Sequence, residues 1–399
     1  MKIITDKNLI DRIFNRGIVV DVIPTKEELF SRLLSGERLK IYIGADPTSS
    51  ALHLSHAKNY MLLEELRQLG HEVFILFGDL TAQIGDPANR SDTRPQLSEK
   101  QVKENVKGWI SQIKPLMDFD NKENPPRILF NSEWLSKLSL KDVIFLAAHF
   151  TVQQMIERDM FEKRLESNIP IYLHEFLYPL MQGYDSVAID VDIELCGTDQ
   201  IFNALAGRTL MKRLKNKDKF IIVVNLMANP KTGELMSKSK GTGVLLSSPP
   251  NEMFGAIMAQ PDEMIELFFI NNTRIPLVEK DKIMALGPRI AKARVAFEIV
   301  KKFYGEEKAK LAEQEFVKRF SEKSIKDSGV PGVRIKGNTV LVEFIFSQGL
   351  AKSKAEARRL VLAGAIDIDG KTRKDPKFVV APSSGQVLKV GKKKFVRVL

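Results

Sequence analysis

The chain has 399 residues, of which 44% are hydrophobic and 28% are charged, which is ordinary for a globular protein. Its one cysteine, Cys196, excludes an internal disulfide and a metal site built from several thiolates. We find no apolar run of about 18 residues and no uncharged N-terminal stretch, so we expect no membrane span, no secretory signal and a cytoplasmic protein.

The net charge of +11 is concentrated near the end of the chain. From Thr339 to Leu399 there are 13 Lys and Arg residues against 5 Asp and Glu residues, which places +8 of the total there. A near-neutral body with a basic terminal module predicts a polyanionic partner. We favour nucleic acid over the alternative, a charged face that only solubilises the protein.

In chain order, the first elements predict a βαβ unit. Apolar β-formers at 39–46 predict a strand, the spacing at 53–69 predicts a helix that stops at Gly70, and 72–78 predicts a buried strand. This order indicates a parallel sheet with a right-handed crossover. The further helices that we expect before residue 245 are at 98–118, 138–148, 151–166, 172–184 and 199–214, and the further strands at 187–194 and 219–226.

The pattern changes in the last third of the chain. Helical spacing continues from 250 to 320, Gly and Pro mark a linker, and an αβ module follows. We therefore expect an α/β fold with a Rossmann-like parallel-sheet catalytic domain, a small all-α domain and a C-terminal α+β module. The predicted boundaries are 1–245, 246–323, a linker at 324–338, and 339–399.

Two histidines open the helix of the βαβ unit. His53 and His56 lie three residues apart and so share one face of a helix. The preceding strand ends in Gly44, Asp46 and Thr48, at the edge where α/β sheets bind ligands. Two histidines alone would be ordinary surface residues, but in this setting they predict an anion site at the helix N-terminus.

A second polar segment, LMSKS at 235–239, places a lysine between two serines far along the chain. Lysine and serine donate hydrogen bonds to phosphate oxygens. Donors of this kind from two distant segments of one chain predict that the chain clamps a polyphosphate.

The residues around these segments resemble the class I aminoacyl-tRNA synthetases. YIGADPTSSALHLSH at 42–56 is similar to their HIGH region, and LMSKS at 235–239 is similar to their KMSKS loop. The motifs between them, GDP at 85–87, YPLMQGYD at 178–185 and GTDQ at 197–200, narrow the resemblance to the tyrosyl-tRNA synthetase family.

Further motifs refine this resemblance. NRSDTRP at 89–95 and NSEWL at 131–135 indicate the bacterial branch exemplified in thermophiles. SKAEARR at 353–359 and GAIDIDG at 364–370 resemble an S4 RNA-binding domain. The RNA-binding residues that this implies are Lys352, Lys354, Arg358 and Arg359, which would track phosphates with a basic stripe on one helix.

The resemblance implies a tyrosine–tRNA ligase. Such an enzyme activates L-tyrosine with ATP to tyrosyl-adenylate and pyrophosphate, then transfers the tyrosyl group to the 3′-terminal ribose of tRNA(Tyr). ATP is then a substrate, Mg²⁺ arrives with it, the protein holds no metal of its own, and the assembly is a homodimer. Tyrosyl-tRNA synthetases are known to reject phenylalanine by about 10⁵-fold without editing.

The resemblance assigns the tyrosine pocket residue by residue. Asp185 would accept the phenol hydroxyl, with Tyr42 as its hydroxyl partner. The residues implied for the ammonium are Asp86, Tyr178 and Gln182, and Gln200 would hold the carboxylate. Tyr178 and Gln182 are four residues apart, so on a helix they can point into one pocket.

The residues that activate ATP are also implied by resemblance. Those with a catalytic role are Thr48, His53, His56, Arg90, Arg94 and Lys238. Those that bind ATP are Gly44, Asp46, His53, His56, Gly197, Asp199, Ser237, Lys238 and Ser239. Thr48 and His53 would contact the γ-phosphate, and Lys238 would neutralise pyrophosphate, chiefly by positioning and charge stabilisation. Arg90 and Arg94 would help Lys238, or could instead be solvated loop charges.

Three positions depart from the family pattern. Ser55 replaces the glycine of HIGH, Cys196 replaces the first of two glycines, and Leu235 replaces the first lysine of KMSKS. A lost donor of this kind costs about 10²- to 10³-fold in rate, and Lys231 or Lys240 could compensate for Leu235. The alternatives left open are a non-catalytic RNA-binding paralogue, another nucleotidyl-transferring enzyme, and an enzyme that activates tryptophan.

Overall fold

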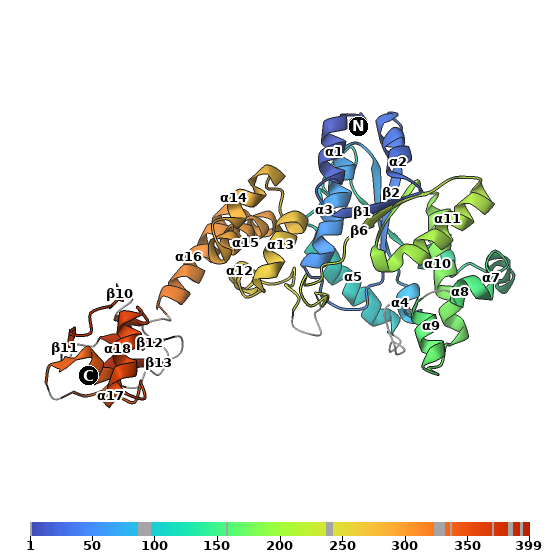
Figure 1. The fold of residues 1–399 in the computed structure, drawn as a ribbon. Helices are drawn as coiled ribbons and strands as arrows, with labels where there is room; N and C mark the ends of the chain where they lie inside the picture. The colour runs from blue at the N-terminus through green and yellow to red at the C-terminus, as the bar shows by residue number, and fades with distance from the viewer. Residues whose placement is uncertain are drawn as a thin grey trace. The chain divides into compact units, whose positions relative to one another are not determined.

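The structure is a computed structural model that describes 2–86, 97–156, 159–236, 242–322, 332–335, 337–368, 371–381, 386–391 and 394–399. The chain forms two compact units, Met1–Ala312 and Glu313–Leu399 (Figure 1). Within the described ranges, no helix is both long enough and apolar enough to cross a bilayer.

A six-stranded sheet forms the centre of the first unit, with the strand order β1-β6-β5-β2-β3-β4. Its strands are β1 Val19–Ile23, β2 Lys40–Ala45, β3 Glu72–Phe77, β4 Arg127–Phe130, β5 Ile193–Gly197 and β6 Phe220–Val224. The strands β2 to β6 pair in parallel, which confirms the predicted parallel sheet. Only β1, at the edge, runs antiparallel to its neighbour β6, and the sequence analysis did not foresee it.

The strand order explains where a ligand can bind. The chain moves from β2 outwards to β3 and β4, then returns to β5 on the other side of β2 and continues to β6. Loops that leave the carboxyl ends of β2 and β5 therefore diverge. Such a switch point is where open α/β sheets bind their ligands.

Helices cover the sheet (Figure 1). Those before residue 245 are α1 Lys7–Phe14, α2 Lys26–Leu34, α3 Leu54–Gln68, α4 Thr81–Ile84, α5 Glu99–Ile113, α6 Ser132–Leu135, α7 Leu140–Ala147, α8 Val152–Ile156, α9 Asp159–Glu166, α10 Leu173–Ile189 and α11 Ile201–Lys215. The strand predicted at 187–194 is wrong in its first part, because α10 continues to Ile189 and ends at Asp190, which takes a left-handed conformation (φ 56°). Val187 belongs to the buried face of α10, and β5 starts only at Ile193.

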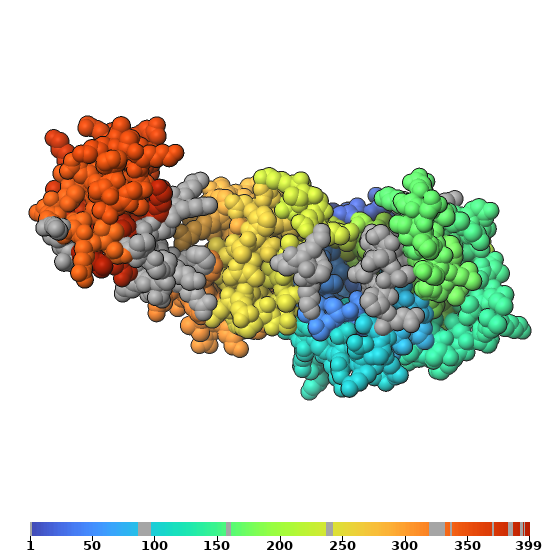
Figure 2. Space-filling model, turned by 90° about the horizontal axis from the view of Figure 1, so that it is seen from below, coloured from blue at the N-terminus to red at the C-terminus, as the bar shows by residue number. Residues whose placement is uncertain are grey.

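The all-helical segment that follows is confirmed. Its longer helices are α12 Pro250–Met258, α13 Ile265–Asn272, α14 Lys280–Met284, α15 Pro288–Tyr304 and α16 Glu306–Glu322. The yellow and orange parts of the segment form a continuous surface in Figure 2. Buried Arg16 joins α13 to the N-terminal part of the unit by donating to the carbonyls of Ile270 (2.8 Å) and Phe269 (3.0 Å).

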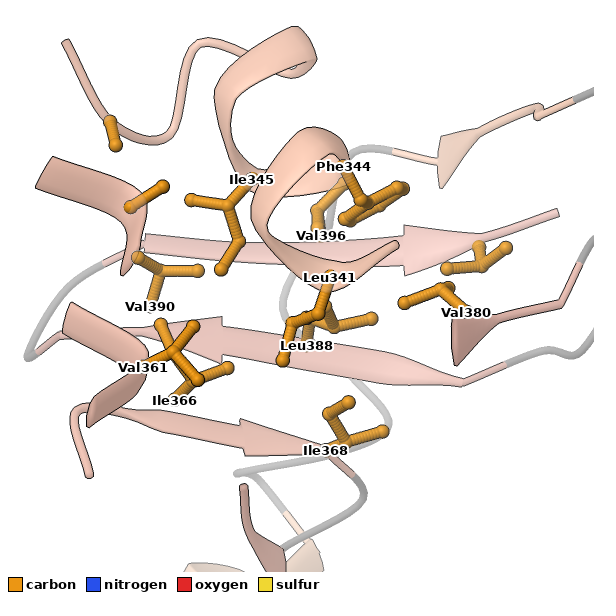
Figure 3. Packing of buried hydrophobic residues seen from close by; sticks show 13 residues of the cluster. Leu341, Phe344, Ile345, Val361, Ile366, Ile368, Val380, Leu388, Val390 and Val396 are labelled. Carbon is orange, nitrogen blue, oxygen red and sulfur yellow. The ribbon is translucent and has the colours of Figure 1, made fainter. Parts of the chain in front are cut away.

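The second unit is α+β, as predicted. It contains α17 Leu341–Ser347, α18 Lys354–Leu362, a five-stranded sheet in the order β10-β9-β12-β13-β7 and a two-stranded sheet of β11 and β8. The strands are β7 Gly332–Val333, β8 Thr339–Val340, β9 Ile366–Ile368, β10 Lys371–Thr372, β11 Val379–Val380, β12 Val387–Val390 and β13 Lys394–Val398. Figure 3 shows Leu341, Phe344 and Ile345 of α17 packed over the sheet, where they bury a single apolar core. Strand β7 falls within the predicted linker, because it pairs with β13 at the sheet edge.

Candidate active site

A cavity of about 350 Å³ opens at the switch point of the first unit. The carboxyl ends of β2 and β5, the start of α3 and one face of α10 surround it. Of the residues predicted for the site, those that line the cavity are Gly44, Asp46, Thr48, His56, Asp86, Tyr178, Gln182, Asp185, Gly197, Asp199 and Gln200. The structure therefore brings together residues that lie as far apart in sequence as Gly44 and Gln200.

The two histidines stand at the N-terminus of α3, with ring centroids 4.1 Å apart. His53 is the N-cap residue, and its backbone N–H donates to Nδ1 of His56 (3.2 Å). That bond leaves Nε2 of His56 to carry the proton. Burial lowers the pKa of His53 to about 4 and the pKa of His56 to about 3. Both imidazoles are therefore neutral at pH 7, and His56 offers a neutral N–H donor to a ligand.

The segment that follows the LMSKS motif lies against the segment that carries the histidines. Leu54 N donates to Val244 O (3.0 Å), and Leu246 N donates to Leu52 O (2.9 Å). These bonds hold the downstream end of the lysine–serine loop beside the start of α3. Ser237, Lys238 and Ser239 themselves lie outside the described residues, as do Arg90 and Arg94.

Asp185 lines the cavity and is itself buried, with 3% of its surface exposed. Its carboxylate accepts hydrogen bonds from Trp134 Nε1 (2.8 Å) and Asn131 Nδ2 (3.4 Å). Burial raises the pKa of Asp185 well above its usual range, and these two bonds oppose that rise only in part. A desolvated carboxyl held by two donors is a strong partner for a hydroxyl group of a ligand.

Tyr42 does not pair with Asp185 in this structure. Its side chain is fully buried in a cluster with Phe74 and Leu76, and its hydroxyl hydrogen-bonds the hydroxyl of Ser186 (2.9 Å). It is not among the residues that line the cavity. The strand β2 is covered on both faces, so a buried tyrosine on it can point either towards the cavity or into the core.

The cavity is also lined by the three side chains implied for an ammonium group, Asp86, Tyr178 and Gln182. The Tyr178 hydroxyl donates to Asp46 Oδ2 (2.9 Å), and Gln200 Nε2 donates to Asp86 Oδ2 (2.7 Å). Gln182 lies between them on α10, four residues after Tyr178. Asp46 also accepts from Thr81 (2.7 Å). The carboxylates therefore face the cavity in fixed orientations, as the recognition of a cation requires.

Another side of the cavity lies at the end of β5. Gly197 ends this strand and Asp199 follows it. The ammonium of buried Lys58, on α3, is attracted by the Asp199 carboxylate. Burial lowers the pKa of Lys58 from 10.5 to about 7, and the attraction of the Asp199 carboxylate offsets only part of this fall. Lys58 Nζ also donates to Asn59 Oδ1 (2.8 Å). This side of the cavity thus combines an anion and a desolvated cation.

The three departures from the family pattern differ in their surroundings. Ser55 and Cys196 both line the cavity, and burial raises the pKa of the Cys196 thiol. Leu235 is 43% exposed and pairs with Ala228 through its backbone. Lys231, one of the two lysines considered as a replacement, forms an ion pair with Glu263. The other, Lys240, lies outside the described residues.

Several residues that shape the cavity escaped the sequence analysis. Trp134 and Asn131 belong to the NSEWL motif, to which the sequence assigned no role in the site. Both are hydrogen-bond donors, which is the signal that could have suggested a partner for a buried carboxylate. Lys58, Glu194 and Lys219 had no signal, because a lysine or glutamate beside an apolar run looks like any solvated charge.

The residues predicted to bind RNA lie on the second unit. Lys352, Lys354, Arg358 and Arg359 are all exposed. The prediction that all four lie on one helix is wrong for Lys352, because Ser353 caps α18 and the helix begins at Lys354. Ala357 of α18 is buried. Arg358 is one helical turn after Lys354, so the two share a face of α18. Lys354 also forms an exposed ion pair with Glu343 (2.9 Å).

The chain is similar to known proteins along nearly its whole length. It matches the family described as tRNA synthetases class I (W and Y) over residues 34–321, and the S4 domain over residues 341–384. It is 42% identical to a tyrosine–tRNA ligase of Thermotoga maritima, with 95% of each chain covered. It is 41% identical to a tyrosine–tRNA ligase of Carboxydothermus hydrogenoformans, with 97% of each chain covered.

A solved structure supports the fold. A C-terminally truncated mitochondrial tyrosyl-tRNA synthetase of Aspergillus nidulans aligns with a TM-score of 0.66 at 22% identity, covering 78% of this chain and 94% of that one. The matched region, the strand order and the cavity at the switch point all agree with the sequence resemblance. The chain therefore belongs to the class I tRNA synthetases of the tryptophan and tyrosine type.

Proposed function

We propose that the chain is a tyrosine–tRNA ligase, which forms tyrosyl-adenylate from L-tyrosine and ATP and then esterifies the terminal ribose of tRNA(Tyr). The observation that carries this proposal is the buried carboxyl of Asp185, which lines the cavity and is held by Trp134 and Asn131. A phenol hydroxyl satisfies it, whereas phenylalanine would leave it without a ligand partner. The indole of tryptophan is also a donor, but its two fused rings need more room beside Asp185 than a phenol does.

In this proposal the substrate ammonium binds among Asp86, Tyr178 and Gln182. The substrate carboxylate then lies towards Gln200 and attacks the α-phosphorus of ATP. A P–O bond to the tyrosyl carboxylate forms as the bond to the β-phosphate oxygen breaks, and pyrophosphate leaves. The protein contributes by aligning the two reactants and stabilising the charge that develops.

We propose that ATP lies along the start of α3. Its ribose binds Gly197 and Asp199, and its phosphates bind Thr48 and His53. Neutral His56 donates a hydrogen bond to the nucleotide from the helix N-terminus, where anions are favoured. Magnesium accompanies ATP as the counter-ion of its phosphates. The proposed roles of Lys238, Arg90 and Arg94 in neutralising pyrophosphate rest on resemblance alone.

The tRNA is proposed to contact both units. The exposed cations on α18 (Lys354, Arg358 and Arg359) and just before it (Lys352) bind the phosphates, which positions RNA without reading its sequence. The proposed domains, in chain order, are a catalytic domain at 1–245, a helical domain at 246–323, a linker at 324–338 and the S4 module at 339–399. The helical domain is proposed to bind the anticodon side of the tRNA. Since aminoacylation supplies the ribosome, we propose that the protein acts in the cytoplasm.

Pyrophosphate exchange tests the proposed activity directly. We expect ATP–pyrophosphate exchange with tyrosine and with none of the other nineteen standard amino acids, because only tyrosine brings a phenol hydroxyl to Asp185. The assay needs the purified chain, ATP, Mg²⁺, labelled pyrophosphate and no RNA. Exchange with tryptophan would reassign the substrate, and folded protein without any exchange would favour the RNA-binding paralogue.

We further propose that the chain forms a homodimer through the apolar surface of α7, α8 and the start of α10. Helices α7 and α10 are in contact, and this surface exposes Leu140 (76%), Ile144, Phe145, Val152 and Leu173 (79%). An apolar patch of this kind on a protein surface marks an interaction site. A second copy of the same patch is its natural partner, because the commonest oligomers are two-fold dimers with self-complementary interfaces.

A charge placed in this patch is expected to separate the subunits. We expect the double variant F145E/L173E to sediment as a monomer at micromolar concentration, where the wild type sediments as a dimer, because each buried charge would lack a partner. Val278→Glu is the matched control, since Val278 is 83% exposed on another surface and should leave the mass unchanged. A dimeric double variant would place the interface elsewhere.

A further inference from the structure

A buried lysine lies behind the wall of the cavity. Lys219 has no exposed surface and does not line the cavity. Its ammonium forms an ion pair with Glu194, which is 2% exposed, and donates to Ser186 Oγ (3.0 Å). The neighbouring backbone makes room for it, since a Cβ atom on Gly207 would lie 2.5 Å from Lys219 Nζ. The local structure is thus built around this cation.

The partners of Lys219 belong to a chain of polar contacts that includes Ser186, the residue after Asp185. Ser186 Oγ hydrogen-bonds the Tyr42 hydroxyl (2.9 Å). Burial raises the pKa of the Tyr42 phenol, and the nearby carboxylate of Glu194 raises it further. Since Glu194 pairs with Lys219 and Lys219 donates to Ser186, the four side chains form one connected polar cluster in the core. Polar networks of this kind are stable only when each member keeps its partners.

This polar cluster also contacts Gln182, one of the residues implied to bind the substrate ammonium. Gln182 Nε2 donates to Glu194 Oε1 (3.2 Å), and Asn203 Nδ2 donates to Gln182 Oε1 (2.9 Å). An ionised carboxylate can only accept hydrogen bonds. Glu194 and Asn203 therefore fix the orientation of the Gln182 amide: the carboxylate of Glu194 accepts from its NH₂ group, and its oxygen, which accepts from Asn203, keeps a second lone pair for a ligand in the cavity that Gln182 lines. A substrate ammonium requires an acceptor, which this orientation provides.

We propose that Lys219 is a positioning residue for tyrosine: through its ion pair with Glu194, it holds the Gln182 amide in the orientation in which the amide oxygen can accept from the substrate ammonium. This inference rests on the proposed function, since it assumes that an amino-acid ammonium binds beside Gln182. Without Lys219, the Glu194 carboxylate would lose the ion pair that holds it where it accepts from Gln182 Nε2. The amide of Gln182 could then turn its NH₂ group towards the cavity, where it would repel the ammonium.

Two variants separate positioning from stability. Lys219→Met is expected to raise the KM for tyrosine by about tenfold or more in pyrophosphate exchange, with the KM for ATP unchanged. It should also lower the melting temperature, because it leaves Glu194 buried without its cation. The double variant K219M/E194Q removes both charges and should recover the melting temperature. Its KM for tyrosine should stay raised, because a glutamine at position 194 can both donate and accept.

A second buried ion pair provides the matched control. Arg67 and Glu64 pair at 2.7 Å with side chains 3% and 8% exposed, and neither lines the cavity. Arg67→Met should lower the melting temperature and leave the KM for tyrosine unchanged. The inference is overturned if K219M keeps the wild-type KM for tyrosine, or if the double variant recovers that KM together with stability. A wild-type chain without tyrosine-dependent exchange would instead refute the proposed function, and this inference with it.

Discussion

Asp185→Asn is expected to lower kcat/KM for tyrosine by about 10²- to 10³-fold in pyrophosphate exchange. The carboxylate is buried, lines the cavity and already binds two donors that orient it, so the hydroxyl of the substrate would meet its remaining acceptor site. An amide at the same position keeps the volume and can still accept from Trp134. It loses the charge, and with it most of the strength of the hydrogen bond to the phenol.

The same substitution is expected to stabilise the folded chain. Burial raises the pKa of Asp185, so ionising this group costs free energy in the folded state at any pH above the ordinary value for an aspartate. The amide side chain of D185N cannot ionise, and this variant should therefore melt at a higher temperature than the wild type at pH 8. The difference should shrink as the pH falls towards 4, where the aspartate is protonated in the unfolded chain as well.

Phenylalanine provides the control for this prediction. The ratio of kcat/KM for tyrosine to that for phenylalanine should fall in D185N by the same factor as the value for tyrosine, since phenylalanine makes no hydrogen bond to the carboxylate. Trp134→Phe removes one orienting donor and should cost less activity than D185N. A D185N enzyme with unchanged discrimination would show that another group recognises the phenol.

The part of the site that follows local patterns could be predicted from the sequence. The helix predicted at 53–69 is α3 Leu54–Gln68, because its apolar spacing and the stop at Gly70 are set within one segment. The position of His53 and His56 at its N-terminus follows from the same local signals. The parallel sheet also followed, since a strand, a helix and a strand in this order leave few arrangements. The switch point did not, because it depends on the order of all six strands.

The buried polar shell could not be predicted, because it depends on the register between strands. Lys219 lies just before β6 and Glu194 in β5, and the two strands pair with Ile193 opposite Phe220. A single sequence contains no information on this register, so Lys219 looks like one more charge in the solvated segment KNKDK at 215–219. The same limit applies to Tyr42. Its strand is buried on both faces, so the sequence shows no alternation of apolar and polar residues that would reveal to which face the Tyr42 side chain points.

Lys58→Met is expected to make the chain more stable near and below neutral pH. The ammonium is almost completely buried, and its pKa falls from 10.5 to about 7 because desolvation outweighs the attraction of Asp199. Keeping this group protonated therefore costs free energy in the folded state. A shift of this size corresponds to about 2–5 kcal/mol, and methionine fills a similar volume without a charge.

The pH dependence of this gain has a definite sign. Between pH 7 and 10.5 the unfolded lysine holds a proton that the folded one has lost, so the wild type gains stability as the pH rises through this range. The advantage of K58M should be largest below pH 7 and should shrink towards pH 10.5. Urea unfolding of both proteins at pH 6, 8 and 10 measures it directly.

Lys107→Met is the matched control, because Lys107 is exposed on α5 and its removal should change stability little at any pH. If K58M were less stable than the wild type at pH 6, the ammonium would have to be compensated within the folded chain. If the gain were equal at pH 6 and pH 10, it would come from packing instead of charge. A gain confined to low pH means that the Lys58 ammonium in the cavity wall costs folding free energy. A bound anionic nucleotide would reduce this cost by pairing with the ammonium.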